Sequence, residues 1–281
     1  MTFREARKEG SDRLARANVD SSSLDSSLLL SYATGFDRVR LLALSEEEIS
    51  ADRVERFRSL IERRASGICV AYLLGLKEFR GLDFVVTPAV LVPRPDTETL
   101  VEAALEWIDE RVSLDPEAPA KLCILDVCTG SGCIAVALKA ERPEVFVSAC
   151  DISSEALAVA RTNSARLLGA IDSTDQVSFF LGDLLTPVPG IFDLIVSNPP
   201  YIPSAQIDTL AREVRNEPNL ALDGGNDGFD TIRRLVPDAF EKLNNRGRLL
   251  IEAGHDQGAG VAKLMAEAGF TDIFFYPDLA G

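Results

Sequence analysis

The sequence has no long apolar run. Its 281 residues contain no apolar stretch of roughly 18 residues, which is the length that a membrane-spanning helix needs. The N-terminal residues Met1–Glu9 also have no apolar segment of the signal-peptide kind. The pattern predicts a cytoplasmic protein that does not associate with a membrane.

Cysteine and histidine are scarce. The chain has five cysteines, an odd number without a Cys-x-x-Cys pair, and one histidine. This pattern predicts reduced thiols and argues against a disulfide-stabilised fold. Because no His, Cys and acidic residues have metal-ligand spacing, we also predict no metal site.

Basic residues are outnumbered by acidic ones. Lys and Arg total 29 against 44 Asp and Glu, which gives a net charge of −15. Nucleic acid is bound through clustered cations, so this charge disfavours a direct nucleic-acid partner. The arginines between Arg53 and Arg64 form a local exception, which we interpret mainly as the solvated face of a helix.

The first part of the chain has the pattern of helices only. One apolar stripe ends at Gly35, a residue type typical of helix C-termini, and another runs from Val54 to Ile61. Ser45–Glu48 has the spacing of a capping box, which would begin a helix. We therefore expect a helical domain over residues 1–74.

The rest of the chain predicts a hairpin and then an α/β domain. Over residues 75–95, short β-rich pieces (Phe84–Val86 and Val90–Val92) alternate with Gly and Pro, which suits a hairpin linker. Over residues 96–281, helices alternate with apolar strands, as in a doubly wound parallel sheet covered on both faces. The strands are expected at Leu122–Asp126, Val145–Asp151, Val177–Leu181, Phe192–Ser197, Arg248–Glu252 and Ile273–Tyr276, and a loop at Ser113–Ala120.

A glycine-containing loop follows the first strand of this domain. It reads Asp-Val-Cys-Thr-Gly-Ser-Gly from Asp126 to Gly132. Ligands of such sheets bind beyond the carboxyl ends of the strands. Gly130 and Gly132 allow a tight turn and close approach of the backbone, and the next helix offers free N–H groups. We therefore expect a ligand at this loop.

Two acidic residues follow the next two strands. Asp151 stands 19 positions after Gly132, where a carboxylate can accept hydrogen bonds from ribose hydroxyls, and Asp183 lies where it can read an adenine edge. The same spacing fits a dinucleotide-binding pattern, so a nicotinamide enzyme remains an alternative. Asp126 at the end of the first strand is instead typical of class I methyltransferases, in which the acid faces the amino-acid end of the cofactor.

The sequence Asn198-Pro199-Pro200-Tyr201 follows the fourth strand. Two prolines cannot continue a central strand, so the chain leaves the sheet in a stiff extended form, and the residue before a proline is held out of the helical region. The Asn198 side-chain carbonyl and a proline backbone carbonyl then form two acceptors that match one –NH2 group, beside the flat face of Tyr201. This pattern predicts methyl transfer from S-adenosylmethionine to a planar amide or amino nitrogen.

The sequence resembles the release factor glutamine methyltransferases, the HemK family, along essentially its whole length. The two most specific matches are Val-Pro-Arg-Pro-Asp-Thr-Glu and Ala-Leu-x-Gly-Gly-x-Asp-Gly, whereas Asn-Pro-Pro-Tyr is shared with adenine amino-methyltransferases. The matching stretches are Ala71–Gly75, Glu78–Gly81, Val90–Glu98, Asp126–Gly132, Asn198–Ile202 and Glu217–Gly228.

The resemblance implies a small N-terminal helical bundle for substrate recognition and a class I methyltransferase domain with a Rossmann-like sheet. The implied substrate is the glutamine of the Gly-Gly-Gln motif in release factors, and the cofactor product is S-adenosylhomocysteine. An adenine amino-methyltransferase is the alternative, and a monomer is expected. The catalytic and substrate-binding residues would be Asn198, Pro199, Pro200 and Tyr201, and the cofactor-binding residues Asp126, Cys128, Thr129, Gly130, Ser131, Gly132, Asp151, Asp183, Leu184 and Asn198. Apart from the resemblance, we expect Arg94 either to guide the substrate or the cofactor carboxylate or to pair with Asp96 or Glu98.

Overall fold

The computed structural model describes residues 1–114, 122–169 and 176–277. Contacts divide the chain into two units: Met1–Leu76 with Ala211–Asn216, and Lys77–Leu210 with Glu217–Gly281. Within the described ranges, no helix is both long and apolar enough to cross a bilayer. Most of the loop expected at Ser113–Ala120 lies outside the described residues.

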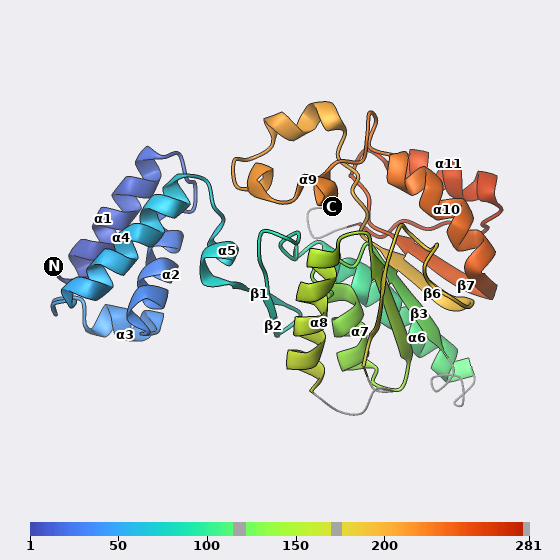
Figure 1. The fold of residues 1–281 in the computed structure, drawn as a ribbon, viewed down its shortest axis with the longest axis horizontal. Coiled ribbons are helices and arrows are strands. Elements are labelled where there is room, and N and C mark those ends of the chain that lie inside the picture. The colour runs from blue at the N-terminus through green and yellow to red at the C-terminus, as the bar shows by residue number, and fades with distance from the viewer. Residues whose placement is uncertain (115–121, 170–175, 278–281) are drawn as a thin grey trace. The chain divides into compact units, whose positions relative to one another are not determined.

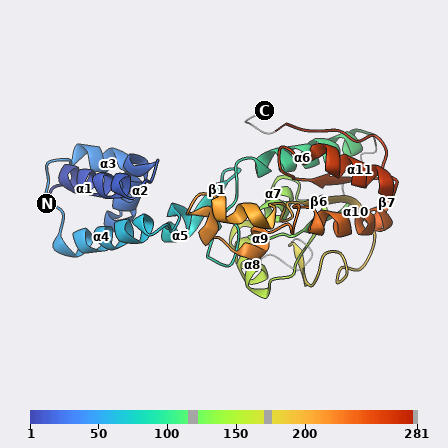
Figure 2. The same ribbon diagram turned by 90° about the horizontal axis from the view of Figure 1, so that it is seen from above.

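The first unit is a bundle of helices, whose members α1, α2 and α4 pack together (Figures 1 and 2). Buried apolar side chains from all of its helices form one core, with Phe57 and Leu29 among the most deeply buried. The helices are α1 (Phe3–Arg16), α2 (Ser22–Thr34), α3 (Arg38–Ala43), α4 (Ala51–Ala65) and α5 (Val70–Leu74).

One helix end agrees with the sequence pattern and another does not. Gly35 ends α2 in the left-handed conformation, as predicted. The capping box predicted at Ser45–Glu48 is wrong, because α4 begins only after Ser50. The carbonyls of Ser45 and Glu47 instead accept the free N–H groups at the start of α1, at 3.0 and 3.2 Å. The capping box of this unit joins Thr2 and Glu5.

A buried arginine of α4 connects three segments of the first unit. Arg64 is 4% exposed and pairs with Asp25 of α2 at 2.7 Å and with Glu213 at 3.3 Å. Nearby, Asn216 donates to the carbonyl of Gly67 at 2.9 Å. The segment 211–216 therefore belongs to this bundle, although more than 130 residues separate it in the chain.

The second unit contains a parallel five-stranded sheet in the order β5-β4-β3-β6-β7. Its strands β3 and β6 are neighbours, and the chain moves outward from them in opposite directions, so their carboxyl ends flank the point where the strand order reverses. A separate hairpin pairs β1 (Leu76–Phe79) with β2 (Leu82–Val85). The sheet strands are β3 (Cys123–Val127), β4 (Phe146–Asp151), β5 (Ser178–Leu181), β6 (Phe192–Ser197) and β7 (Leu243–Ile251).

Helices cover both faces of this sheet (Figure 1). Alternate residues of β3 enter opposite cores: Ile124 packs in the core formed with α6, α7 and α8, and Leu125 in the core formed with α10 and α11. This arrangement confirms the predicted doubly wound fold. The helices are α6 (Thr97–Leu114), α7 (Cys133–Glu141), α8 (Ser154–Leu168), α9 (Asn219–Leu222), α10 (Asp230–Lys242) and α11 (Gly258–Ala268).

Two predicted strands are absent from the described residues of this unit. Val90–Val92 is a loop, because the N–H of Val92 donates to the buried carboxylate of Glu217 at 2.9 Å instead of to a neighbouring strand. Ile273–Tyr276 is also not a strand, and its aromatic side chains are exposed, so they give this segment no buried face.

Candidate active site

A cavity of about 220 Å³ lies within the second unit, at the carboxyl ends of the sheet strands. It brings together most of the residues predicted for cofactor binding, namely Cys128, Thr129, Gly130, Ser131, Asp151, Asp183, Leu184 and Asn198, together with Pro200. Asp126, Gly132, Pro199 and Tyr201 are not among its lining residues. The site therefore consists of a lined cavity and a set of supporting residues behind it.

The loop after β3 turns tightly through left-handed backbone conformations. Cys128, Gly130 and Gly132 have φ values of 62°, 55° and 79°. A Cβ atom at Gly132 would lie 3.1 Å from the Cβ of Ala160 in α8, so glycine allows the loop and this helix to pack closely. A Cβ atom at Gly130 would meet no atom within 4 Å, so the cavity is open beside this residue.

Asp126 supports this loop from the protein interior. It is fully buried, and its Oδ2 accepts hydrogen bonds from the Thr129 hydroxyl at 2.6 Å and from the Ala135 N–H at 3.2 Å. Its Oδ1 has no hydrogen-bond partner among the described residues. Burial raises the pKa of Asp126 to about 7, against the effect of these two donors. The carboxyl group therefore holds the loop in place and does not face the cavity.

Asp151 presents its carboxylate on the cavity wall. Its Oδ2 accepts the N–H of Gly130 and its Oδ1 that of Ser153, both at 2.9 Å. Burial raises the pKa of this carboxyl, although the two backbone donors oppose the shift. Each oxygen keeps a second lone pair, so the group can still accept two hydroxyl donors.

Asp183 and Leu184 lie at the edge of the cavity. The Asp183 carboxylate pairs with Arg234 of α10 at 2.5 Å, and both side chains are exposed. Leu184 adopts a left-handed conformation with a φ of 46°, and its carbonyl accepts the Cys150 thiol at 3.2 Å. Arg234 also lines the cavity, and no pattern in the sequence indicated it.

Asn198 lines the cavity directly after β6. Its Nδ2 donates to the hydroxyl of Thr97 at 3.1 Å, and Thr97 is buried. The hydroxyl of Tyr201 donates to Oε1 of Glu252 at 3.3 Å, whereas Oε2 is buried without a hydrogen-bond partner among the described residues. Burial raises the pKa of Glu252, although the side chains of Thr97 and Tyr201 lower it. Glu252 directly follows β7, and Asp151 ends β4, so an acidic residue at a strand end is a signal that could have identified Glu252.

Arg94 also lines the cavity, but its partner is neither Asp96 nor Glu98. It pairs with the buried carboxylate of Glu217 at 2.5 Å. Glu217 lies more than 120 residues away in the sequence, so local spacing could not indicate this pair.

The buried surroundings of the three cavity thiols, those of Cys128, Cys133 and Cys150, make them unreactive. Burial raises the pKa of Cys133 and Cys150 to about 12, and raises that of Cys128 well above its ordinary value. The thiols therefore stay protonated near neutral pH, and Cys128 contributes its backbone to the loop. No cluster of potential metal ligands occurs in the described ranges.

Comparisons with known proteins agree with this architecture. Residues 5–75 match the PrmC N-terminal domain and residues 113–225 the Methyltransferase small domain. The chain is 44% identical to the release factor glutamine methyltransferase of Moorella thermoacetica, over 100% of this chain and 96% of that protein. It is 43% identical to that of Geobacter sulfurreducens, over 95% and 89%.

The chain belongs to the release factor glutamine methyltransferase family. It also shares its fold with the hMettl16 catalytic domain, solved with a MAT2A 3′UTR hairpin, at a TM-score of 0.51 and 14% identity over 76% of this chain and 74% of that one. As a member of this family it is an S-adenosylmethionine-dependent class I methyltransferase, which confirms the predicted fold, activity and cofactor. The nicotinamide alternative is therefore wrong.

The cavity of this release factor glutamine methyltransferase provides polar and apolar groups that suit S-adenosylmethionine. Asp151 offers a carboxylate to ribose hydroxyls, and the loop around Gly130 exposes backbone to the cavity. Apolar wall is available for an adenine ring from Leu184 and Ile152. These residues fit an adenosine group that carries an amino-acid chain.

Proposed function

We propose that this methyltransferase modifies the side-chain amide nitrogen of the glutamine in the Gly-Gly-Gln motif of peptide chain release factors. The observation that supports it most directly is the orientation of Asn198. Because its Nδ2 is bound to Thr97, its Oδ1 is the atom left to accept a hydrogen bond from a substrate –NH2 group.

The proposed clamp has two acceptors. Asn198 Oδ1 accepts one amide hydrogen and the backbone carbonyl of Pro199 accepts the other. An amide nitrogen is a poor nucleophile because its lone pair is delocalised, so holding both hydrogens turns the lone pair toward the methyl group. Orientation of this kind can lower a barrier by about 7–11 kcal/mol.

The remaining predicted residues serve this clamp and the cofactor. Pro200 lines the cavity beside Asn198, and Tyr201 holds the end of the clamp through Glu252. Asp151 binds the ribose, Asp183 and Leu184 border the adenine, and residues 128–131 enclose the methionine part, with Gly132 supporting their loop. When bound, S-adenosylmethionine would supply a methyl group from its cationic sulfur: the C–N bond would form as the C–S bond breaks, the neutral thioether S-adenosylhomocysteine would leave, and the amide nitrogen would release one of its two protons to solvent.

The first unit is proposed to select the protein substrate. Asn198 recognises only an amide, which every exposed glutamine offers, so selectivity needs contacts elsewhere. Acidic and basic residues balance over 1–76, and the net charge of −15 therefore arises in the rest of the chain. We propose a cytoplasmic monomer that binds release factors and does not bind nucleic acid directly.

A radiolabelled methyl-transfer assay tests this function. Release factor, DNA and ribosomal proteins are offered in parallel, and mass spectrometry locates the methyl group. We expect one methyl group on the glutamine of Gly-Gly-Gln. Preferential methylation of adenine in DNA would instead support the amino-methyltransferase alternative.

A further inference from the structure

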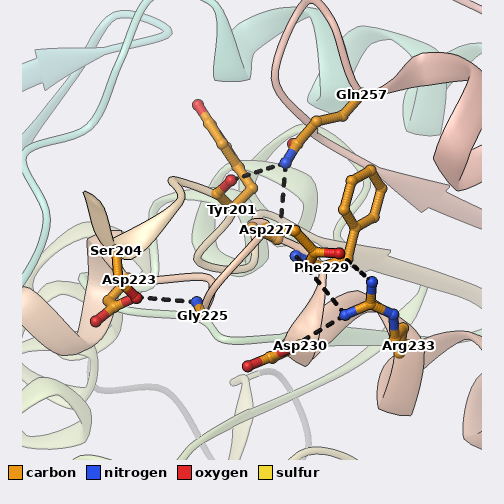
Figure 3. Close-up of polar contacts among 10 residues, drawn as sticks. Tyr201, Ser204, Asp223, Gly225, Asp227, Phe229, Asp230, Arg233 and Gln257 are labelled. Carbon is orange, nitrogen blue, oxygen red and sulfur yellow. Dashed lines mark hydrogen bonds and ion pairs between the residues drawn. The ribbon is translucent and has the colours of Figure 1, made fainter. Parts of the chain in front are cut away.

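The Gly-Gly-Asn-Asp-Gly turn at residues 224–228 packs against the chain that leaves the clamp. It is part of one of the two most specific sequence matches, yet none of these residues lines the cavity. The N–H of Ile202 donates to the carbonyl of Leu222 at 3.0 Å, and that of Gly224 to the carbonyl of Ile202 at 2.9 Å. Asp223 binds Ser204 and Gly225, as Figure 3 shows.

The glycines of this turn are required by close approach to Tyr201. A Cβ atom at Gly224 would lie 2.8 Å from the Cα of Tyr201, and one at Gly228 would lie 2.3 Å from its carbonyl oxygen. Gly228 also has a φ of 81°, which disfavours other residues. Only glycine at positions 224 and 228 therefore lets the turn pack this closely against the backbone of Tyr201.

Gln257 connects the turn to Tyr201. Its buried side chain donates from Nε2 to the carbonyls of Tyr201 at 2.9 Å and Gly228 at 3.4 Å (Figure 3). Its Oε1 accepts the N–H of Gly254 at 2.9 Å, directly beyond β7. One side chain thus joins its own loop to two segments that lie 56 and 29 residues away in the sequence.

The clamp depends on the anchors at its two ends. Pro199 and Pro200 have no N–H, so neither can donate to a neighbouring strand. Before them, the Ser197 hydroxyl donates to the carbonyl of Val127 at 2.8 Å. After them, the carbonyl of Tyr201 is held by Gln257. The proline pair is stiff, so its position follows from these two ends.

We propose that Gln257 is a positioning residue for methyl transfer: by tying Tyr201 to the glycine turn, it sets the direction of the Asn198 and Pro199 acceptors. This inference rests on the proposed function. Gln257 acts through the clamp and does not touch the cavity. A misplacement on the order of 1 Å can cost about a hundredfold in rate.

Two substitutions test this role. Gln257→Met fills the same space without a donor, and Gln257→Glu keeps the shape but carries a carboxylate that repels the two carbonyls. We expect kcat on intact release factor to fall about tenfold to a hundredfold in both, with the dissociation constant of S-adenosylmethionine unchanged in calorimetry. Asn244→Ala is the matched control, because it removes a hydrogen-bonded side-chain amide near the start of β7, bound to Asp193 near the start of β6, whereas the clamp follows the other end of that strand.

The Gln257→Glu variant gives a second signature. A protonated glutamic acid regains one donor toward Tyr201, so its kcat relative to wild type should rise as the pH falls. Hydrogen exchange should also be faster at the amides of Ile202 and Gly224 in both variants. These readouts distinguish positioning from a general loss of stability.

The outcomes separate the inference from the proposed function. If wild-type protein methylates release factor and the folded variants do so at the same kcat, Gln257 has no positioning role. If the variants only lower the melting temperature, its role is structural and the inference is wrong. Wild-type protein without activity on release factor would contradict the proposed function itself.

Discussion

The amide of Asn198 is oriented by the hydroxyl of Thr97, which accepts from its Nδ2 at 3.1 Å. Thr97 begins α6, whereas Asn198 follows β6, 101 residues later in the chain. The contact fixes which end of the amide is available to a ligand. The sequence pattern identified Asn198, but the orientation of its side chain depends on Thr97, which the pattern did not identify.

Removing the Asn198 amide should impair chemistry more than cofactor binding. We expect Asn198→Ala to lower the methyl-transfer rate on the order of 10²–10³-fold, as for other single positioned hydrogen-bond groups. Single-turnover kinetics with saturating cofactor measure this rate. Near-normal turnover in the variant would disprove the clamp.

Asp151 should control cofactor affinity. Asp151→Ala removes hydrogen bonds to a charged acceptor, a loss of about 1.5–3 kcal/mol in total, so S-adenosylmethionine should bind about tenfold to a hundredfold more weakly. Isothermal titration calorimetry measures the change. Unchanged affinity would place Asp151 outside the cofactor contacts.

Asp126 should make the folded state less stable as the pH rises. Burial raises its pKa from 3.8 to about 7, so between these values the folded protein binds the proton more tightly than the unfolded chain, and the free energy of unfolding falls with pH. Asp126→Asn cannot ionise and should lack this decrease, which is on the order of 2–4 kcal/mol. Urea denaturation at mildly acidic and mildly alkaline pH measures it. If the free energies of unfolding of the wild type and of Asp126→Asn differ by the same amount at both pH values, the pKa of Asp126 is not raised.

The buried arginine of the first unit should matter more than an exposed one. Arg64→Met leaves Asp25 and Glu213 without their partner, and breaking a buried pair costs about 3–5 kcal/mol. Arg58→Met is the control, because Arg58 pairs with Glu9 in solvent and its loss should change stability little. Thermal denaturation compares the two. Equal losses of stability in the two variants would show that the buried Arg64 ion pairs stabilise the fold no more than the exposed pair of Arg58.

An intact release factor should be a better substrate than a short Gly-Gly-Gln peptide. Glycine allows the backbone to enter a narrow cavity, but it offers few contacts, so the rest of a large partner must be positioned elsewhere. We expect a much higher kcat/KM for the whole protein in competition assays. Equal values would mean that contacts outside the glutamine do not select the substrate.

The sequence predicted the fold and most of the cavity because both depend on local patterns. Apolar strands alternating with helices indicated the sheet, and glycines and acids at strand ends indicated the loop and Asp151. Thr97, Glu217 and Gln257 could not be found in this way, because each binds a residue more than 50 positions away. Val90–Val92 was wrongly assigned for the same reason: its apolar pattern resembles a strand, but the partner of its N–H is a distant carboxylate.

The placement of Ala211–Asn216 has a consequence for how such proteins can be recombined. Glu213 and Asn216 bind Arg64 and Gly67, so the contacts that hold the helical unit together come from two separate stretches of the chain. A chimera that takes only residues 1–76 from a relative would combine these helices with a foreign Ala211–Asn216 segment. Both stretches should therefore be inherited together, and a single crossover after Leu76 should yield poorly matched hybrids.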